Sequence, residues 1–227
     1  MIAAQDQLKE RLERVESRIA AAVARAGRKR SEVLLVAVTK KFPARVIQEA
    51  YALGLRDFGE NYVQEFEGKH PELANCPAAR YHFIGHLQSN KTKKAAEIFD
   101  VIQTVDSAKI ARRLDAEAAE AGLDVLIEVK LSTEPAKAGA APGEVLALVE
   151  AIRGCGNLRL LGLMTMPPWS EDAEQSRGYF ARLRELAGAN GLKHLSMGMS
   201  HDLEVAIEEG ATIVRVGTAL FGPRKKD

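Results

Sequence analysis

Short apolar segments alternate with helix-forming segments along the chain, and this alternation limits the possible folds more than any other feature. Apolar runs, each short enough for a strand, lie at residues 33–38, 55–59, 80–84, 101–105, 124–130, 158–164, 194–197 and 211–216. Four intervening segments are rich in the helix formers Ala, Leu, Glu and Arg, at residues 44–53, 107–121, 143–153 and 172–187. Such alternation is typical of a parallel sheet whose strands are connected by helices. The sequence therefore predicts an α/β protein.

The number of units favours a closed barrel. Eight candidate strands in 227 residues fit a (β/α)8 TIM barrel better than an open doubly wound sheet. The open sheet would be expected to carry a glycine-rich nucleotide fingerprint, and Gly154-Cys155-Gly156 does not qualify because it precedes a strand. Residues 2–26 predict an additional amphipathic helix, which we expect to close the outer ring of helices. No linker or low-complexity tract interrupts residues 1–227, so we expect a single domain.

Charge and cysteine content exclude several classes of protein. A formal net charge of +1 creates no field that would attract nucleic acid or an anionic membrane. The N-terminus is charged where an export signal would be apolar, and Cys76 and Cys155 are far apart, as expected for reduced thiols. We therefore expect a cytoplasmic protein, and for a single-domain protein of this kind we expect a monomer. His82 and His86 are four residues apart, but they have no matching third ligand nearby, so we predict no metal site.

Lys40 follows the first apolar run and is expected at the carboxyl end of a buried strand. Burial at that position disfavours the charged amine and makes the nitrogen a nucleophile. Such an amine suits Schiff-base formation with an aldehyde, and pyridoxal 5'-phosphate (PLP) is the aldehyde most often held in this way. The alternative is a solvated loop lysine beside Lys41 and Pro43.

Two loops have the composition of a phosphate site. In barrels of this type, phosphate groups commonly bind at the loops after strands seven and eight. The first of these loops contains Ser196-Met197-Gly198-Met199-Ser200, and the second contains Gly217 and Thr218. Both provide backbone N–H groups, a glycine that permits close approach and a hydroxyl donor. The alternative is that Ser200 and Thr218 simply cap helices.

Arg215 interrupts the eighth apolar run just before the second of these loops. A buried guanidinium keeps its charge and needs a partner. One interpretation is a salt bridge inside the barrel, for example with Glu128. The other interpretation places Arg215 against the pyridine nitrogen of a cofactor. Arg215 can donate a hydrogen bond to that nitrogen only while the ring is unprotonated. An unprotonated ring is a weaker electron sink.

Taken together, these segments resemble the family of PLP-binding homeostasis proteins, which shares the barrel of the alanine racemase N-terminal domain. The motifs run in order across nearly the whole chain: AVTKKFP at 37–43, FGENYVQE at 58–65, HFIGHLQSNK at 82–91, GLMTMPP at 162–168, LSMGMSHDLEVAI at 195–207 and VRVGTALFG at 214–222. The resemblance implies that Lys40 is the Schiff-base lysine and that Lys41 is its neighbour.

The resemblance also implies roles for other residues. Asn61 would approach the cofactor ring, His82 and Met164 would line its pocket, and Arg215 would face the pyridine nitrogen. The phosphate would be held by Ser196, Met197, Gly198, Ser200, Gly217 and Thr218. Lys137 falls in a loop where the family has a lysine. Two interpretations of Lys137 are open: a transient acceptor of the aldehyde during cofactor transfer, or a surface lysine. The basic tail Arg224-Lys225-Lys226 is expected to be solvated.

We therefore expect a non-catalytic PLP carrier that stores, delivers or regulates the cofactor and contacts PLP-dependent apo-enzymes transiently. The alternative is a racemase-like PLP enzyme, which would need a second acid/base group on the opposite face of the cofactor. The racemases of this fold take that group from a separate C-terminal domain of a partner subunit, and we expect no such domain here. A barrel that binds another phosphorylated metabolite is a third possibility.

Overall fold

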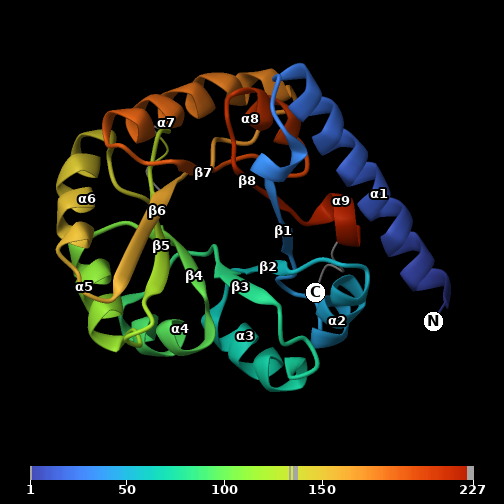
Figure 1. Ribbon diagram of the computed structural model, residues 1–227, viewed down its shortest axis with the longest axis horizontal. Coiled ribbons are helices and arrows are strands. Elements are labelled where there is room, and N and C mark those ends of the chain that lie inside the picture. The colour runs from blue at the N-terminus through green and yellow to red at the C-terminus, as the bar shows by residue number, and fades with distance from the viewer. Residues whose placement is uncertain (1, 133, 135–137, 224–227) are drawn as a thin grey trace.

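The computed structural model describes residues 2–132, 134 and 138–223, and eight strands of this part form a closed barrel in chain order (Figure 1). Neighbouring strands are parallel throughout, and β1 pairs with β8 to close the barrel. The strands are β1 Leu34–Val38, β2 Asp57–Glu60, β3 Arg80–Phe83, β4 Val101–Val105, β5 Leu123–Glu128, β6 Leu158–Met164, β7 His194–Ser196 and β8 Ile213–Val216. Each coincides with a predicted apolar run, so the predicted α/β barrel is confirmed.

Helices connect the strands and surround the barrel (Figure 1). They are α1 Ile2–Arg25, α2 Ala44–Ala52, α3 Val63–Lys69, α4 Thr92–Ile98, α5 Ala108–Glu117, α6 Val145–Arg153, α7 Arg177–Ala189, α8 Leu203–Glu208 and α9 Thr218–Phe221. Helix α5 ends earlier than the predicted 107–121 segment, because Ala118 leaves the helix in an extended conformation.

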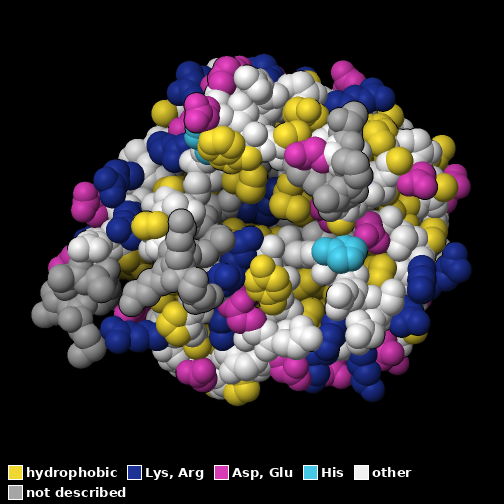
Figure 2. Space-filling view, turned by 180° about the vertical axis from the view of Figure 1, so that it is seen from behind, with side chains coloured by type: hydrophobic (Ala, Val, Ile, Leu, Met, Phe, Trp, Pro, Cys, Tyr) yellow, Lys and Arg dark blue, Asp and Glu magenta, His cyan; other side chains and the backbone are white. Residues whose placement is uncertain are grey.

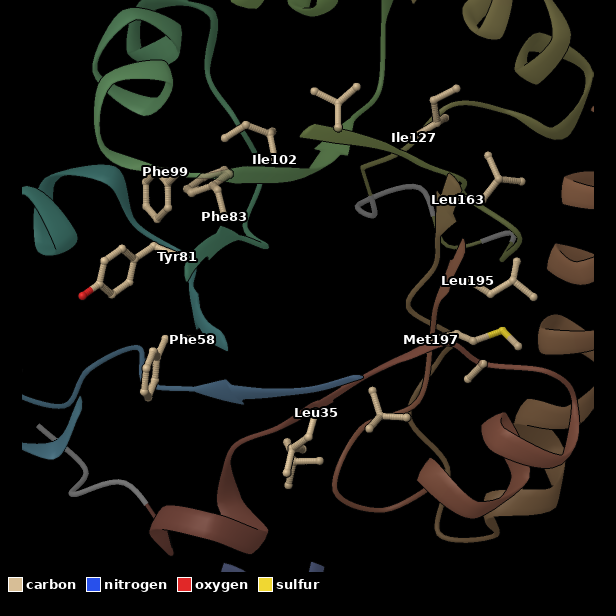
Figure 3. Packing of buried hydrophobic residues seen from close by; sticks show 14 of the residues in the cluster. Leu35, Phe58, Tyr81, Phe83, Phe99, Ile102, Ile127, Leu163, Leu195 and Met197 are labelled. Carbon is tan, nitrogen blue, oxygen red and sulfur yellow. The ribbon is translucent and has the colours of Figure 1, made fainter. Parts of the chain in front are cut away.

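The apolar core has two parts. The larger part fills the space between the barrel and its helices, and Figure 3 shows side chains such as Phe58, Ile102 and Leu163 in this layer. The smaller part includes Val36 and Leu126 on strands of the barrel. Successive side chains of a strand point to opposite faces, so each strand contributes both to the outer layer and to the barrel interior.

Helix α1 packs along α8 and α9 and thereby fills the last position in the outer ring (Figure 1). Its buried face includes Val15 and Ile19. Two ion pairs fix its position against α8: the guanidinium of Arg18 lies 2.6 Å from Glu204, and that of Arg25 lies 2.9 Å from Glu208. The predicted N-terminal helix therefore has the role expected from the sequence.

No helix in the described part of the chain is long and apolar enough to span a bilayer. Both cysteines are free thiols; Cys76 is buried and Cys155 is half-buried. The described residues contain no group of three or more His, Cys, Asp or Glu side chains placed to hold a metal ion. Within the histidine pair, the Nε2 atom of His82 instead lies 2.8 Å from Asp57, and the Nδ1 atom of His86 lies 3.7 Å from Asp106.

Candidate functional site

A cavity of about 510 Å³ lies at the carboxyl ends of the strands, on the face where barrels of this kind carry their functional residues. Figure 2 shows one face of the molecule with a central hollow, where Lys and Arg side chains lie among hydrophobic ones. The cavity is lined by Val38, Lys40, Asn61, Ile84, Met166, Trp169, Met199, Ser200, His201, Arg215, Gly217, Thr218 and Ala219. One amine, one guanidinium, two hydroxyls and an apolar wall therefore meet in one space.

Lys40 reaches this cavity because β1 ends two residues before it. The strand's hydrogen bonding extends one residue further, since the N–H of Thr39 donates to the carbonyl of Gly59 at 2.9 Å. Lys40 is half-buried, whereas the next residue, Lys41, is exposed. Of the two adjacent lysines, Lys40 therefore lines the cavity and Lys41 faces solvent.

The two loops predicted to hold a phosphate are joined to each other. The backbone N–H of Ala219, in the first turn of α9, donates to the Ser200 hydroxyl at 3.2 Å. The buried Asp202 fixes the first loop by accepting from the N–H of Met199 at 2.7 Å. This contact places the Ser200 hydroxyl next to the start of α9, where Thr218 supplies a second hydroxyl to the cavity.

Arg215 is buried on β8 and forms hydrogen bonds within the barrel. Its Nη1 atom donates to the Ser196 hydroxyl at 2.6 Å, and its Nη2 atom donates to the carbonyl of Thr165 at 2.9 Å. Burial lowers the pKa of this guanidinium to about 10, an effect opposed by the negative charges of Asp202 and Glu128. Arg215 therefore remains a cation at neutral pH, and its orientation is fixed.

The hydrogen bonds continue from Arg215 through the barrel to the opposite end. The Ser196 hydroxyl donates to the Gln103 side-chain carbonyl at 2.6 Å, and the Gln103 amide lies 2.9 Å from Nδ1 of His82. The Nε2 atom of His82 lies 2.8 Å from a carboxylate oxygen of Asp57. These residues come from β8, β7, β4, β3 and β2, so the chain crosses the interior. We call it the polar chain.

Each residue of the polar chain donates a hydrogen bond to the next one, in the order from Arg215 to Asp57. Arg215 can only donate, so the Ser196 oxygen accepts from it and the hydroxyl proton goes to Gln103. The Gln103 NH₂ group then faces His82, whose Nδ1 atom must be the acceptor. Asp57 accepts the Nε2 proton. With the Gln103 amide in this orientation, the Nδ1 atom of His82 accepts and its Nε2 atom carries the proton that Asp57 accepts.

A second cavity, of about 790 Å³, adjoins the first and shares Met166, Trp169 and Met199 with it. Glu128, at the end of β5, lines this second cavity and is only 4% exposed. Burial raises the pKa of the Glu128 carboxyl to about 7, although the positive charge of Arg215 opposes the rise. Glu128 is thus an acid/base group that titrates near neutral pH beside the cavity of Lys40.

Asn61 is placed by a close approach between two loops. Gly85, just after β3, lies so near Asn61 that a Cβ atom at position 85 would collide with the Asn61 carbonyl. The Gly85 carbonyl also accepts a hydrogen bond from Thr104 at 2.6 Å. The side-chain Oδ1 atom of Asn61 is buried and has no hydrogen-bond partner among the described residues. A ligand in the cavity could supply that missing donor.

The structure divides the residues selected from the sequence into two groups. Those that line the cavity of Lys40 are Lys40, Asn61, Ser200, Arg215, Gly217 and Thr218. Those that do not are His82, Met164, Ser196, Met197 and Gly198. Lys137 and the tail Arg224-Lys225-Lys226 lie outside the described residues.

The second group has other contacts in this structure, and its direct contact with the cofactor stays a prediction. His82 and Ser196 belong to the polar chain, and Met164 packs in the barrel interior. Met197, one residue beyond β7, packs in the layer beneath the helices, whereas the preceding Ser196 points into the barrel. Gly198 has a φ of +89° and packs against Ala206.

Several site residues were not selected from the sequence. Met166, Met199 and His201 lie inside recognised motifs beside selected residues, so motif position was a usable signal for them. Trp169 lies just beyond the GLMTMPP motif; it is exposed and its ring centroid lies 6.4 Å from that of His201. Gln103 had no sequence signal, because a single glutamine in an apolar strand is not distinctive.

Comparison with known proteins places the chain in a family. The model of the alanine racemase N-terminal domain matches residues 11–225. A pyridoxal phosphate homeostasis protein of Pseudomonas aeruginosa is 51% identical over 220 residues, which cover 95% of each chain. The PLP-bound structure of PipY from Synechococcus elongatus is 39% identical, with a TM-score of 0.85, and the match covers 95% of this chain and 100% of that one.

Alanine racemase from Corynebacterium glutamicum is similar in fold alone, at 17% identity and a TM-score of 0.70, with 96% of this chain matching 62% of the racemase. The matches to the homeostasis proteins, in contrast, combine high identity with nearly complete coverage of both chains. The chain therefore belongs to the pyridoxal phosphate homeostasis protein family, within the wider family of alanine racemase N-terminal domains.

Proposed function

We propose that this protein binds PLP in the cavity of Lys40, holds it as a Schiff base with that lysine, and serves in PLP homeostasis without robust catalytic turnover. The observation that carries the proposal is the meeting of Lys40, Arg215 and the two hydroxyl-bearing loops in one cavity. The name of the Pseudomonas relative and the PLP bound to PipY support the same cofactor.

The cavity fits PLP in size and chemistry. Its volume of about 510 Å³ is within the usual range of small-molecule sites, roughly 300–1,000 Å³. The amine of Lys40 suits the aldehyde, and the hydroxyls of Ser200 and Thr218 suit the phosphate. The unpartnered Oδ1 atom of Asn61 is available to a polar group on the ring.

Arg215 determines what the bound cofactor would do. PLP serves in enzymes as an electron sink, and it does so best when its pyridine nitrogen is protonated. Arg215 keeps its protons and can donate to that nitrogen only while the nitrogen is unprotonated. Hydrogen bonds to the Ser196 hydroxyl and the Thr165 carbonyl hold the guanidinium in place, so it stays beside the cavity as a donor. This arrangement favours holding the cofactor over using it.

Glu128 is the feature that favours the alternative, a racemase-like PLP enzyme. A carboxyl whose pKa is raised to about 7 is suited to exchange protons at neutral pH, and it lies in the cavity next to that of Lys40. The two functions differ in whether a bound amino acid loses its α-hydrogen.

Hydrogen exchange at the α-carbon therefore tests the proposal. The PLP-loaded protein is incubated with common L-amino acids in deuterated water, and α-deuteration is measured by NMR or mass spectrometry. We expect exchange far slower than in dedicated PLP enzymes. Rapid exchange that disappears in both Lys40→Ala and Glu128→Gln would establish the enzyme instead.

A second experiment tests the phosphate loops. Pyridoxal, which lacks the phosphate, should bind at least about a hundredfold more weakly than PLP, because charge-assisted hydrogen bonds of ~1.5–3 kcal/mol each would be lost. Equal affinities would refute the assignment of the loops after β7 and β8.

We also propose that the protein acts as a cytoplasmic monomer and passes PLP to apo-enzymes by transient contact. Sedimentation of the loaded protein, alone and with a PLP-dependent apo-enzyme, tests this. A stable dimer would contradict the monomer, and a long-lived complex would contradict transient transfer.

A further inference from the structure

An ionic cluster with two buried members and one half-buried member lies beneath the turn that carries Lys40. Its members are Glu60 at the end of β2 and Glu65 and Lys69 on α3, and we call it the turn clamp. The ammonium of Lys69 lies 3.0 Å from Glu60 and 2.5 Å from Glu65. The Glu60 side chain is fully buried, and that of Lys69 is only 10% exposed. Buried charges are costly unless they are paired, so this cluster holds its geometry firmly.

The turn clamp contacts the backbone on both sides of Lys40. Before Lys40, the Thr39 hydroxyl donates to Glu60 at 2.8 Å, and the Lys69 ammonium donates to the Thr39 carbonyl at 3.2 Å. After Lys40, the backbone N–H of Lys41 donates to Glu65 at 2.6 Å. Every member of the clamp therefore bonds to a residue that flanks Lys40.

The backbone at Lys41 shows what the clamp maintains. Lys41 has a φ of +65°, the left-handed conformation, and it is the non-glycine residue with positive φ in the described part of the chain. Residues other than glycine occupy this region at a cost that the surroundings must offset. The hydrogen bond from the Lys41 N–H to Glu65 holds this conformation in place. The sharp change in backbone direction leaves Lys40 lining the cavity and Lys41 exposed.

We infer that the turn clamp selects Lys40 over Lys41 as the amine that bonds to the aldehyde ligand. Glu60, Glu65 and Lys69 are thus positioning residues: they act through the backbone at Thr39 and Lys41. The inference rests on the proposed function, since it takes the ligand to be an aldehyde such as PLP. It also gives a role to two glutamates of the FGENYVQE motif that the cavity itself does not use.

Trapping the covalent adduct tests this inference. Wild-type protein and Lys69→Met are incubated with PLP, reduced with borohydride and digested, and the label on Lys40 and on Lys41 is quantified by mass spectrometry. We expect the ratio of label on Lys40 to label on Lys41 to fall by about tenfold in Lys69→Met, the effect of releasing a strained backbone conformation. The matched control is Lys94→Met, which removes a lysine paired with Glu67 and Glu97 at the surface.

A second pair of variants keeps the test decisive if Lys69→Met does not fold. Glu65→Ala removes the acceptor of the Lys41 N–H, whereas Glu65→Gln retains one. Without any ligand, amide hydrogen exchange at Lys41 should accelerate about tenfold in Glu65→Ala and much less in Glu65→Gln, because only the first exposes a hydrogen-bonded amide. The labelling ratio should change in the same order.

The outcomes separate the inference from the proposed function. Folded variants that keep the wild-type labelling ratio would overturn the turn clamp as a selector, even if they are less stable. Wild-type protein that takes up no label on Lys40 would overturn the proposed function itself.

Discussion

Replacement of Glu128 by Gln should change how stability depends on pH, and the structure sets the size of the change. Burial raises the pKa of this carboxyl from 4.5 to about 7. One pKa unit corresponds to ~1.4 kcal/mol, so ionising Glu128 in the folded state costs about 3 kcal/mol more than in the unfolded state.

The sign follows from proton binding. The folded protein binds the Glu128 proton more tightly than the unfolded chain does, so the unfolding free energy should fall as the pH rises from about 4.5 to about 7 and then level off. Gln cannot ionise and should not show this loss. Relative to wild type, Glu128→Gln should therefore gain up to about 3 kcal/mol between about pH 4.5 and pH 8.

Urea denaturation of the PLP-free protein at a series of pH values measures this directly. The difference in unfolding free energy between wild type and Glu128→Gln cancels the titration of all other groups. Glu13→Gln, on the exposed side of α1, is the matched control for the loss of a carboxylate. A flat difference for Glu128→Gln would refute the claim that this carboxyl is buried and titrates near neutral pH.

Three further predictions concern the interior of the barrel. Ser196→Ala breaks the polar chain and leaves buried groups without partners, so it should lower the unfolding free energy, measured by heat or urea, by about 1–3 kcal/mol. The exposed Ser17→Ala should lower it by less than about 0.5 kcal/mol. Equal effects would contradict the polar chain. Nitrogen-15 NMR of the PLP-free protein should show a proton on Nε2 of His82 and none on Nδ1, and a proton on Nδ1 would disprove the direction assigned to the polar chain. Gly85→Ala should displace the Asn61 loop and weaken PLP binding by about tenfold or more. The new methyl group would collide with the backbone of Asn61, and no side-chain rotation can relieve that collision. Unchanged affinity would show that this close approach is unimportant.

The barrel could be predicted because most of its strands are short apolar runs with their own local signal, although β2 and β3 carry charged or polar residues such as Asp57 and Arg80. A parallel strand buried on both faces reads as a nearly continuous run of apolar residues, and Leu34–Val38 is such a run. The end of α5 was less predictable, because the helix formers continue past Glu117 and only tertiary structure ends the helix there.

The cavity residues were predictable to the extent that they follow a strand. Lys40 and Thr218 come directly after apolar runs, at the edge where such barrels place their sites. The sequence did not distinguish the neighbours Ser196 and Met197, because both belong to one loop motif. The alternation of side chains at the end of β7 puts Ser196 inside the barrel and Met197 outside it.

The polar chain was beyond prediction from one sequence. Its members lie on five different strands, and their contact depends on the register between strands and on the closure of the barrel. The turn clamp is similar in kind, since Glu60 and Lys69 meet Thr39 only through the pairing of β1 with β2.

The central claim is that Lys40 binds PLP covalently, and one measurement tests it most directly. Purified protein is loaded with PLP, its visible absorption band is recorded, and borohydride reduction is followed by peptide mapping, for wild type and for Lys40→Ala. We predict a band that borohydride bleaches and a label found chiefly on Lys40, both absent from a Lys40→Ala protein that is still folded. A label found chiefly on another lysine, or a band that persists in Lys40→Ala, would contradict the account.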